Sequence, residues 1–320
     1  MTASIKAGLR AAVRHPKLVW LIWAWYGLLA LVPALPAWNW WSAALGSSPE
    51  AASVLKRFDI GVFLDLTAGK GIDGLGLLTG AAVGAALVAL VSSAFTIGGI
   101  LEVFASGDDR RSFMHRFFRG GGHFFWRFFR LAIIAGACLV FATGAVAALM
   151  AAAIAPTSES EWEPAAYLGG VASIVVILVV AALFLLALDY ARIRVARDDS
   201  RSMLKAYASG LGFVLRRLFT VYGIAVAILI FEVALVLGYV AYESYAPAAG
   251  TWGAITALVV VQQIAVVGRV FLRVALVGAE RHFHTAALPS LVPIALPEFI
   301  AAEALVAPVA VEPEQTQNPA

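Results

Sequence analysis

One sequence pattern occurs twice in this chain, 90 positions apart. The two copies begin with Asp108-Asp109-Arg110-Arg111-Ser112 and with Asp198-Asp199-Ser200-Arg201-Ser202. Each start is followed by an amphipathic stretch, a Gly-x-Gly pair that is expected to break the helix, an arginine and a long apolar run. Apolar residues at positions 113, 114, 117 and 118 recur at helical spacing, which places them on one helix face. The pattern predicts a basic amphipathic helix that leads into a membrane span.

The composition also points to lipid as the main solvent. Of the 320 residues, 62% are hydrophobic and 13% are charged, whereas a soluble domain averages about 45–50% apolar and about 25% charged. A helix needs about 20 mostly apolar residues to cross the hydrocarbon core. We therefore predict an all-α bundle of transmembrane helices over residues 1–284 and a flexible, Pro-rich cytoplasmic tail over 285–320. The six predicted spans are 18–38, 77–104, 131–155, 166–188, 219–242 and 253–278.

The positions of lysine and arginine predict the orientation. They precede the first span and fill the connections between spans 2 and 3 and between spans 4 and 5, while the alternate connections are acidic or nearly uncharged. Because cations are retained on the cytoplasmic side, both termini are expected in the cytoplasm, with the chain in a bacterial inner membrane. The first span is expected to remain in the protein, since cleavage after Ala37 would place Leu35 where a small residue is preferred.

The N-terminus contains a third, weaker copy of the pattern. Ile5, Leu9, Ala12 and Val13 form an apolar stripe, Lys6, Arg10, Arg14 and Lys17 form a basic one, and His15-Pro16 replaces the Gly-x-Gly pair. The repeating unit is thus a cytoplasmic amphipathic elbow helix followed by a transmembrane hairpin, and three units give six spans. Asp108 and Asp198 are expected to cap the second and third elbow helices.

The elbow helices are candidates for contact with anionic phospholipid. A basic face meets headgroups while an apolar face sinks toward the acyl boundary. The alternative is that these helices only orient the spans. The predicted headgroup contacts are Arg10, Arg14, Arg116, Arg119, Arg127, Arg201, Lys205 and Arg217.

Three polar residues interrupt the last two spans. Glu232 lies near the middle of span 5, where an acid is costly unless it is neutral or paired. Gln262 and Gln263 lie in span 6, about as far from its outer end as Glu232 is from the outer end of span 5. We therefore predict an intramembrane cluster of these three residues, either as polar glue between helices or as a site for a proton or solute.

A second polar group is predicted at the inner interface. Arg269 and Arg273 share one helical face with Gln262 and Glu280, because the four residues are spaced by 7, 4 and 7 positions. Asp189, at the end of span 4, lies at a similar depth, so it is expected to pair with one of these arginines or with Arg192 on its own helix. The pair is either a structural clamp or part of a substrate site.

No catalytic, metal-binding or cofactor-binding pattern is found. The single cysteine, Cys138, excludes a disulfide within the chain, and the five histidines lack the spacing of a zinc helix. Nothing in the sequence indicates nucleic-acid binding.

The units 4–35, 106–155 and 197–242, with Asp189-Tyr190-Ala191-Arg192 between them, resemble a loose group of uncharacterised bacterial six-span membrane proteins. The same plan resembles the membrane domain of some glycerophosphodiester phosphodiesterases, whose soluble catalytic domain has no counterpart here. The resemblance implies an accessory or transport-like role without catalysis. We expect a non-enzymatic scaffold or accessory subunit that organises lipid or a partner complex, together with another membrane protein or a second copy. The alternative is a small-solute or lipid transporter that uses Glu232, Gln262 and Gln263.

Overall fold

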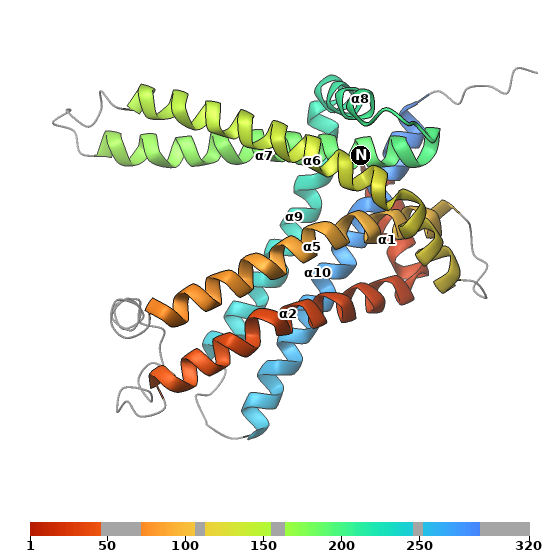
Figure 1. Cartoon of the computed structure of the whole chain (residues 1–320). Coiled ribbons are helices and arrows are strands. Elements are labelled where there is room, and N and C mark those ends of the chain that lie inside the picture. Colours follow the sequence, from red (N-terminus) through yellow and green to blue (C-terminus); the bar gives the residue numbers. More distant parts are fainter. Residues whose placement is uncertain (46–71, 106–112, 155–163, 246–251, 289–320) are drawn as a thin grey trace, which may run out of the picture. The chain divides into compact units, whose positions relative to one another are not determined.

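The computed structural model describes residues 1–45, 72–105, 113–154, 164–245 and 252–288 (Figure 1). Regular structure in these ranges is entirely α-helical, as predicted. The chain divides into two units, Met1–Phe283 and His284–Ala320, and most of the predicted tail lies outside the described residues. The helices are α1 (Thr2–Arg14), α2 (Pro16–Leu45), α5 (Ile72–Ala105), α6 (Phe113–Ile154), α7 (Pro164–Asp198), α8 (Met203–Arg216), α9 (Leu218–Tyr245) and α10 (Trp252–Ala287).

Six of the described helices are long and apolar enough to cross a membrane, in agreement with the six predicted spans. They are α2, α5, α6, α7, α9 and α10. Large apolar side chains on these helices are exposed: Phe219 is 90% exposed and Phe141 is 80% exposed. Such exposure is unfavourable in water but not among acyl chains. The class that these features indicate is a multi-pass α-helical membrane protein.

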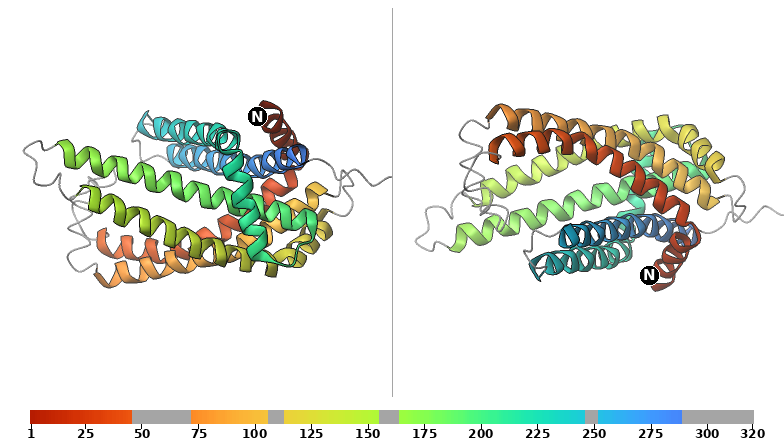
Figure 2. Two further views of the ribbon diagram at one scale, coloured as in Figure 1. Left: turned by 90° about the horizontal axis from the view of Figure 1, so that it is seen from above. Right: turned by 90° about the horizontal axis from the view of Figure 1, so that it is seen from below.

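Consecutive spans pack as hairpins. Helix α2 contacts α5, and α6 contacts α7. Helices α9 and α10 meet at Gly268, where an added Cβ atom would lie 3.0 Å from a methyl carbon of Leu235. Figure 2 shows the three pairs: α2 with α5 in red and orange, α6 with α7 in yellow-green and green, and α9 with α10 in teal and blue.

The predicted amphipathic segments are helical, but two of their breaks are not where they were predicted. Helix α1 stops before Pro16, which opens α2, because proline has no N–H to donate and suits the first turn of a helix. Helix α8 continues past its Gly-x-Gly pair to Arg216. Helix α6 also continues past its pair and forms one helix of 42 residues. The predicted Gly-x-Gly breaks are therefore wrong in both copies.

The first glycine of each pair instead permits close approach between helices. A Cβ atom on Gly120 would collide with a side chain of α5. One on Gly210 would lie 2.7 Å from the carbonyl oxygen of Ala187 on α7. Gly8 of α1 is packed in the same way against Ala275 of α10. Each amphipathic segment therefore packs against a span of another hairpin, at a point where only glycine fits.

The predicted capping role of Asp198 is wrong. Asp198 is the last residue of α7, and its carboxylate lies 3.3 Å from Nε of Arg194 on the same helix. The N-cap of α8 is Ser202, which makes no side-chain capping bond. The reason is that α7 extends well past the apolar run that predicted the end of span 4. Asp108, the other predicted cap, lies outside the described residues.

Candidate functional site

Helix α1 has two faces of opposite character. Its buried stripe consists of Ser4, Gly8 and Ala12. Its exposed stripe consists of Lys6, Arg10 and Arg14. Both stripes follow the four-residue spacing that places side chains on one side of a helix. The packed stripe anchors the helix to the protein and leaves three cations available on the opposite side.

The other predicted headgroup residues differ in what they contact. Arg201 and Lys205 are exposed near the start of α8. Arg119 is also exposed, although its guanidinium lies 3.8 Å from Glu102. The guanidinium of Arg217 lies over the rings of Phe213 and Phe283, 5.4 and 5.9 Å from their centroids. Arg116 is half-buried.

Arg127 binds an acid of the protein. Its guanidinium donates to Oδ1 of Asp199, and Nε2 of His123 lies 3.8 Å from the same oxygen. The hydrogen bond and the charge of Arg127 hold the pKa of the Asp199 carboxyl below its ordinary value, because they stabilise the charged form. Arg127 therefore ties α6 to the connection between α7 and α8 and does not offer a free cation to lipid.

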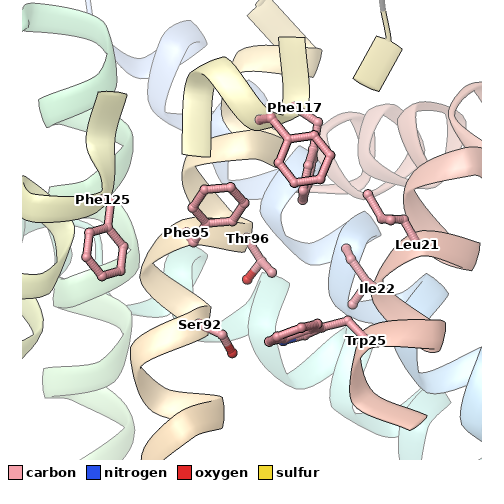
Figure 3. Close-up of a pocket in the computed structure, with 9 residues that line it drawn as sticks. Leu21, Ile22, Trp25, Ser92, Phe95, Thr96, Phe117 and Phe125 are labelled. Atoms are coloured by element: carbon pink, nitrogen blue, oxygen red, sulfur yellow. The ribbon is translucent and has the colours of Figure 1, made fainter. Parts of the chain in front are cut away.

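An apolar cavity of about 400 Å³ lies between α2, α5 and α6. Figure 3 shows Trp25 of α2, Phe95 of α5 and the α6 residues Phe117 and Phe125 around it. The hydroxyls of Ser92 and Thr96 also line it, but each donates to a carbonyl oxygen of its own helix, at 3.0 and 3.2 Å. The cavity therefore presents an apolar wall to an occupant.

Glu232 is paired with an arginine. Nε of Arg269 donates to Oε1 of Glu232 at 2.7 Å, between α10 and α9. The sequence analysis predicted Gln262 or Gln263 as the partner of Glu232. That prediction assumed that residues equally far from the outer ends of their helices lie at equal depth. The contact of Gly268 with Leu235 instead sets a register that brings Arg269 to Glu232.

The two glutamines have other surroundings. Oε1 of Gln263 accepts a hydrogen bond from the indole N–H of Trp23 at 3.1 Å, which links α10 to α2. Gln262 is exposed on α10. The described contacts therefore do not form the predicted three-residue cluster, and the role of these residues in transport stays a prediction.

Asp189 is brought together with two of its predicted partners. Its Oδ1 accepts from Arg192 at 3.2 Å, and its Oδ2 accepts from Arg273 at 3.4 Å. The first contact lies within α7, and the second joins α7 to α10. Arg269, the other predicted partner, pairs with Glu232 instead. The side chain of Arg192 is 5% exposed and that of Arg273 is 50% exposed, so the group lies at the edge of the buried core.

Glu280 also belongs to this group, although the sequence analysis placed it on the same helical stripe without including it in the predicted ion pair. It is 1% exposed on α10, and neither carboxylate oxygen has a hydrogen-bond partner among the described residues. Asp189, Arg192 and Arg273 are its main electrostatic neighbours. Its position two turns beyond Arg273 on the same face was a usable signal, but that spacing alone does not reveal that α7 covers it.

No group of three histidine, cysteine or acidic side chains that could hold a metal is found in the described part of the chain. The chain matches no family model, no curated protein and no solved structure. Its resemblance to six-span bacterial proteins therefore stays a prediction.

Proposed function

We propose that this protein is a non-enzymatic scaffold or accessory subunit that gathers anionic phospholipid around its amphipathic helices. The observation that carries the proposal is the exposed stripe of Lys6, Arg10 and Arg14 on α1, opposite a buried stripe that fixes the helix in place. Arg201 and Lys205 extend the same chemistry to α8. Each cation near an anionic leaflet contributes about 1 kcal/mol.

The proposal includes an orientation and a repeat. The protein lies in a bacterial inner membrane with both termini in the cytoplasm. This orientation follows because lysine and arginine are enriched in the segments that contain α1 and α8. The three units are each an amphipathic segment followed by a hairpin. The equivalent close packing at Gly8, Gly120 and Gly210 supports this repeat.

The apolar cavity between α2, α5 and α6 is the second proposed site of contact with lipid. It lies among spans, where acyl chains are the surrounding solvent, and its lining offers carbon atoms rather than free polar groups. We propose that an acyl chain occupies it. Another membrane protein or a second copy of the chain would then assemble through this bound lipid.

The test is lipid retention by the full chain in nanodiscs that contain zwitterionic and anionic phospholipid. Native mass spectrometry counts the lipids that stay bound. The wild type should retain anionic lipid preferentially, and Lys6→Gln, Arg10→Gln and Arg14→Gln together should weaken this preference by about fivefold per residue. Arg10→Lys with Arg14→Lys is the matched control, because it keeps the charge. Equal retention by the glutamine variant would contradict the proposal.

A further inference from the structure

Glu280 and Arg192 have unmatched hydrogen-bonding groups within one buried cluster. Both oxygens of the Glu280 carboxyl lack a donor, and Nε of Arg192 is buried without an acceptor. The two side chains are close enough to interact electrostatically. A buried donor or acceptor that is left unsatisfied is unfavourable, and more so when the group is charged. An alternative arrangement in which Arg192 binds Glu280 therefore competes with the observed one.

The hydrogen-bond partners of Arg192 and Arg273 indicate whether Glu280 is protonated or ionised in this arrangement. Arg192 and Arg273 both donate to Asp189 and leave the Glu280 oxygens bare. An ionised Glu280 would attract a guanidinium, because a buried charge without a partner is strongly unfavourable. Unpartnered oxygens are less unfavourable for an uncharged acid than for a carboxylate, so this arrangement favours the protonated form of Glu280.

We infer that Glu280 is a proton-binding site whose proton decides which acid Arg192 binds. With the proton bound, Asp189 holds both arginines. When the proton leaves to water, Arg192 moves one N–H donor from Asp189 to the Glu280 carboxylate, while Arg273 remains on Asp189. The two acids and two arginines then pair one to one.

The exchange has a structural consequence because the groups lie on different helices. Asp189 and Arg192 belong to α7, whereas Arg273 and Glu280 belong to α10. With the proton bound, the Asp189–Arg273 pair is the ionic bridge between them in this cluster. Loss of the proton adds the Arg192–Glu280 bridge, so α7 and α10 become more tightly joined. Tyr190, which is buried on α7, is a further titratable side chain near Glu280.

The test is infrared spectroscopy of the full chain in nanodiscs at neutral pH, with and without ¹³C-labelled glutamate. A carboxylic-acid C=O band that shifts with the label should be present in the wild type and absent in Glu280→Gln. Glu232→Gln is the matched control and should keep the band, because Glu232 is held by Arg269. A wild-type spectrum without a glutamate-sensitive acid band would overturn the proposal.

A second variant tests the exchange of partners. Asp189→Asn releases both arginines, so Glu280 should lose its proton and the acid band should disappear although Glu280 is unchanged. Persistence of the band in Asp189→Asn would overturn the exchange. This variant also keeps the proposal testable if Glu280→Gln does not fold. The proposal does not depend on lipid binding, because none of the four residues lies on the exposed stripe of α1.

Discussion

Nε of Arg269 lies 2.7 Å from Oε1 of Glu232 and joins α10 to α9 inside two membrane spans. Either side chain alone would be costly in a hydrocarbon environment, whereas the pair neutralises both charges. The contact also fixes the register of the last hairpin, together with the close approach of Gly268 to Leu235.

Removing both partners of this pair should cost less than the sum of the costs of removing each one. Glu232→Gln is expected to destabilise the protein by about 1–2 kcal/mol, because it leaves the Arg269 charge without its acid. Arg269→Gln should do the same, and the double variant should cost less than the sum of the two. Unfolding in mixed micelles measures all four proteins. Strictly additive losses would show that the two side chains do not interact.

Glycine positions two residues apart on α8 should respond oppositely to alanine. Gly210→Ala should destabilise by about 1–3 kcal/mol, because the new methyl group meets the backbone of α7. Gly212 has nothing within 4 Å of an added Cβ atom. Gly212→Ala should therefore be neutral or stabilising by up to about 1 kcal/mol, from helix propensity. Thermal unfolding compares the two variants, and equal effects would argue against the packing of α8 on α7.

The Arg127–Asp199 pair should give the protein an acid-sensitive contribution to stability. The pKa of Asp199 is held below its ordinary value of 3.8 in the fold, mainly by the hydrogen bond from Arg127. The contribution is therefore present above pH 3.8 and is lost as the pH falls through the lowered pKa. The difference in unfolding free energy between wild type and Asp199→Asn should shrink over that acid range and with added salt. A difference independent of pH would contradict this role.

Tyr207 should resist ionisation. Burial raises the pKa of its phenol to about 12, with a smaller effect of Cys138, and its hydroxyl donates to the carbonyl oxygen of Phe184 at 3.3 Å. The linked stability is full below pH 10.0, the ordinary value, and is lost as the pH rises toward about 12. Tyr207→Phe should cost about 1 kcal/mol. Titration of both proteins by tyrosinate absorbance checks this. The wild type should show one ionisation near pH 12 that Tyr207→Phe lacks. A transition near pH 10 would contradict the burial.

The spans could be predicted because their signal is local. About 20 consecutive apolar residues identify a membrane helix without any knowledge of its neighbours. The Gly-x-Gly pairs could not be interpreted in the same way, since glycine permits both a chain break and close helix packing. Only the positions of α5 and α7 show that Gly120 and Gly210 serve packing.

The polar sites depended on contacts between helices, which the sequence specifies less directly. Asp189 was placed near Arg273 because their depths could be counted from apolar runs. The partner of Glu232 was mispredicted because helices α9 and α10 are offset along their length. Glu280 was overlooked as a site because its burial arises from helices distant in sequence.

The most direct test of the proposed lipid scaffold is the composition of the lipid that surrounds the protein when it is excised from a bacterial inner membrane into polymer-bounded discs. The ratio of anionic to zwitterionic phospholipid in the discs should exceed that of the bulk membrane for the wild type. It should fall toward the bulk value when Lys6, Arg10 and Arg14 are replaced by glutamine, without reaching it, because Arg201 and Lys205 near the start of α8 remain exposed. A wild-type ratio equal to that of the bulk membrane would contradict the account.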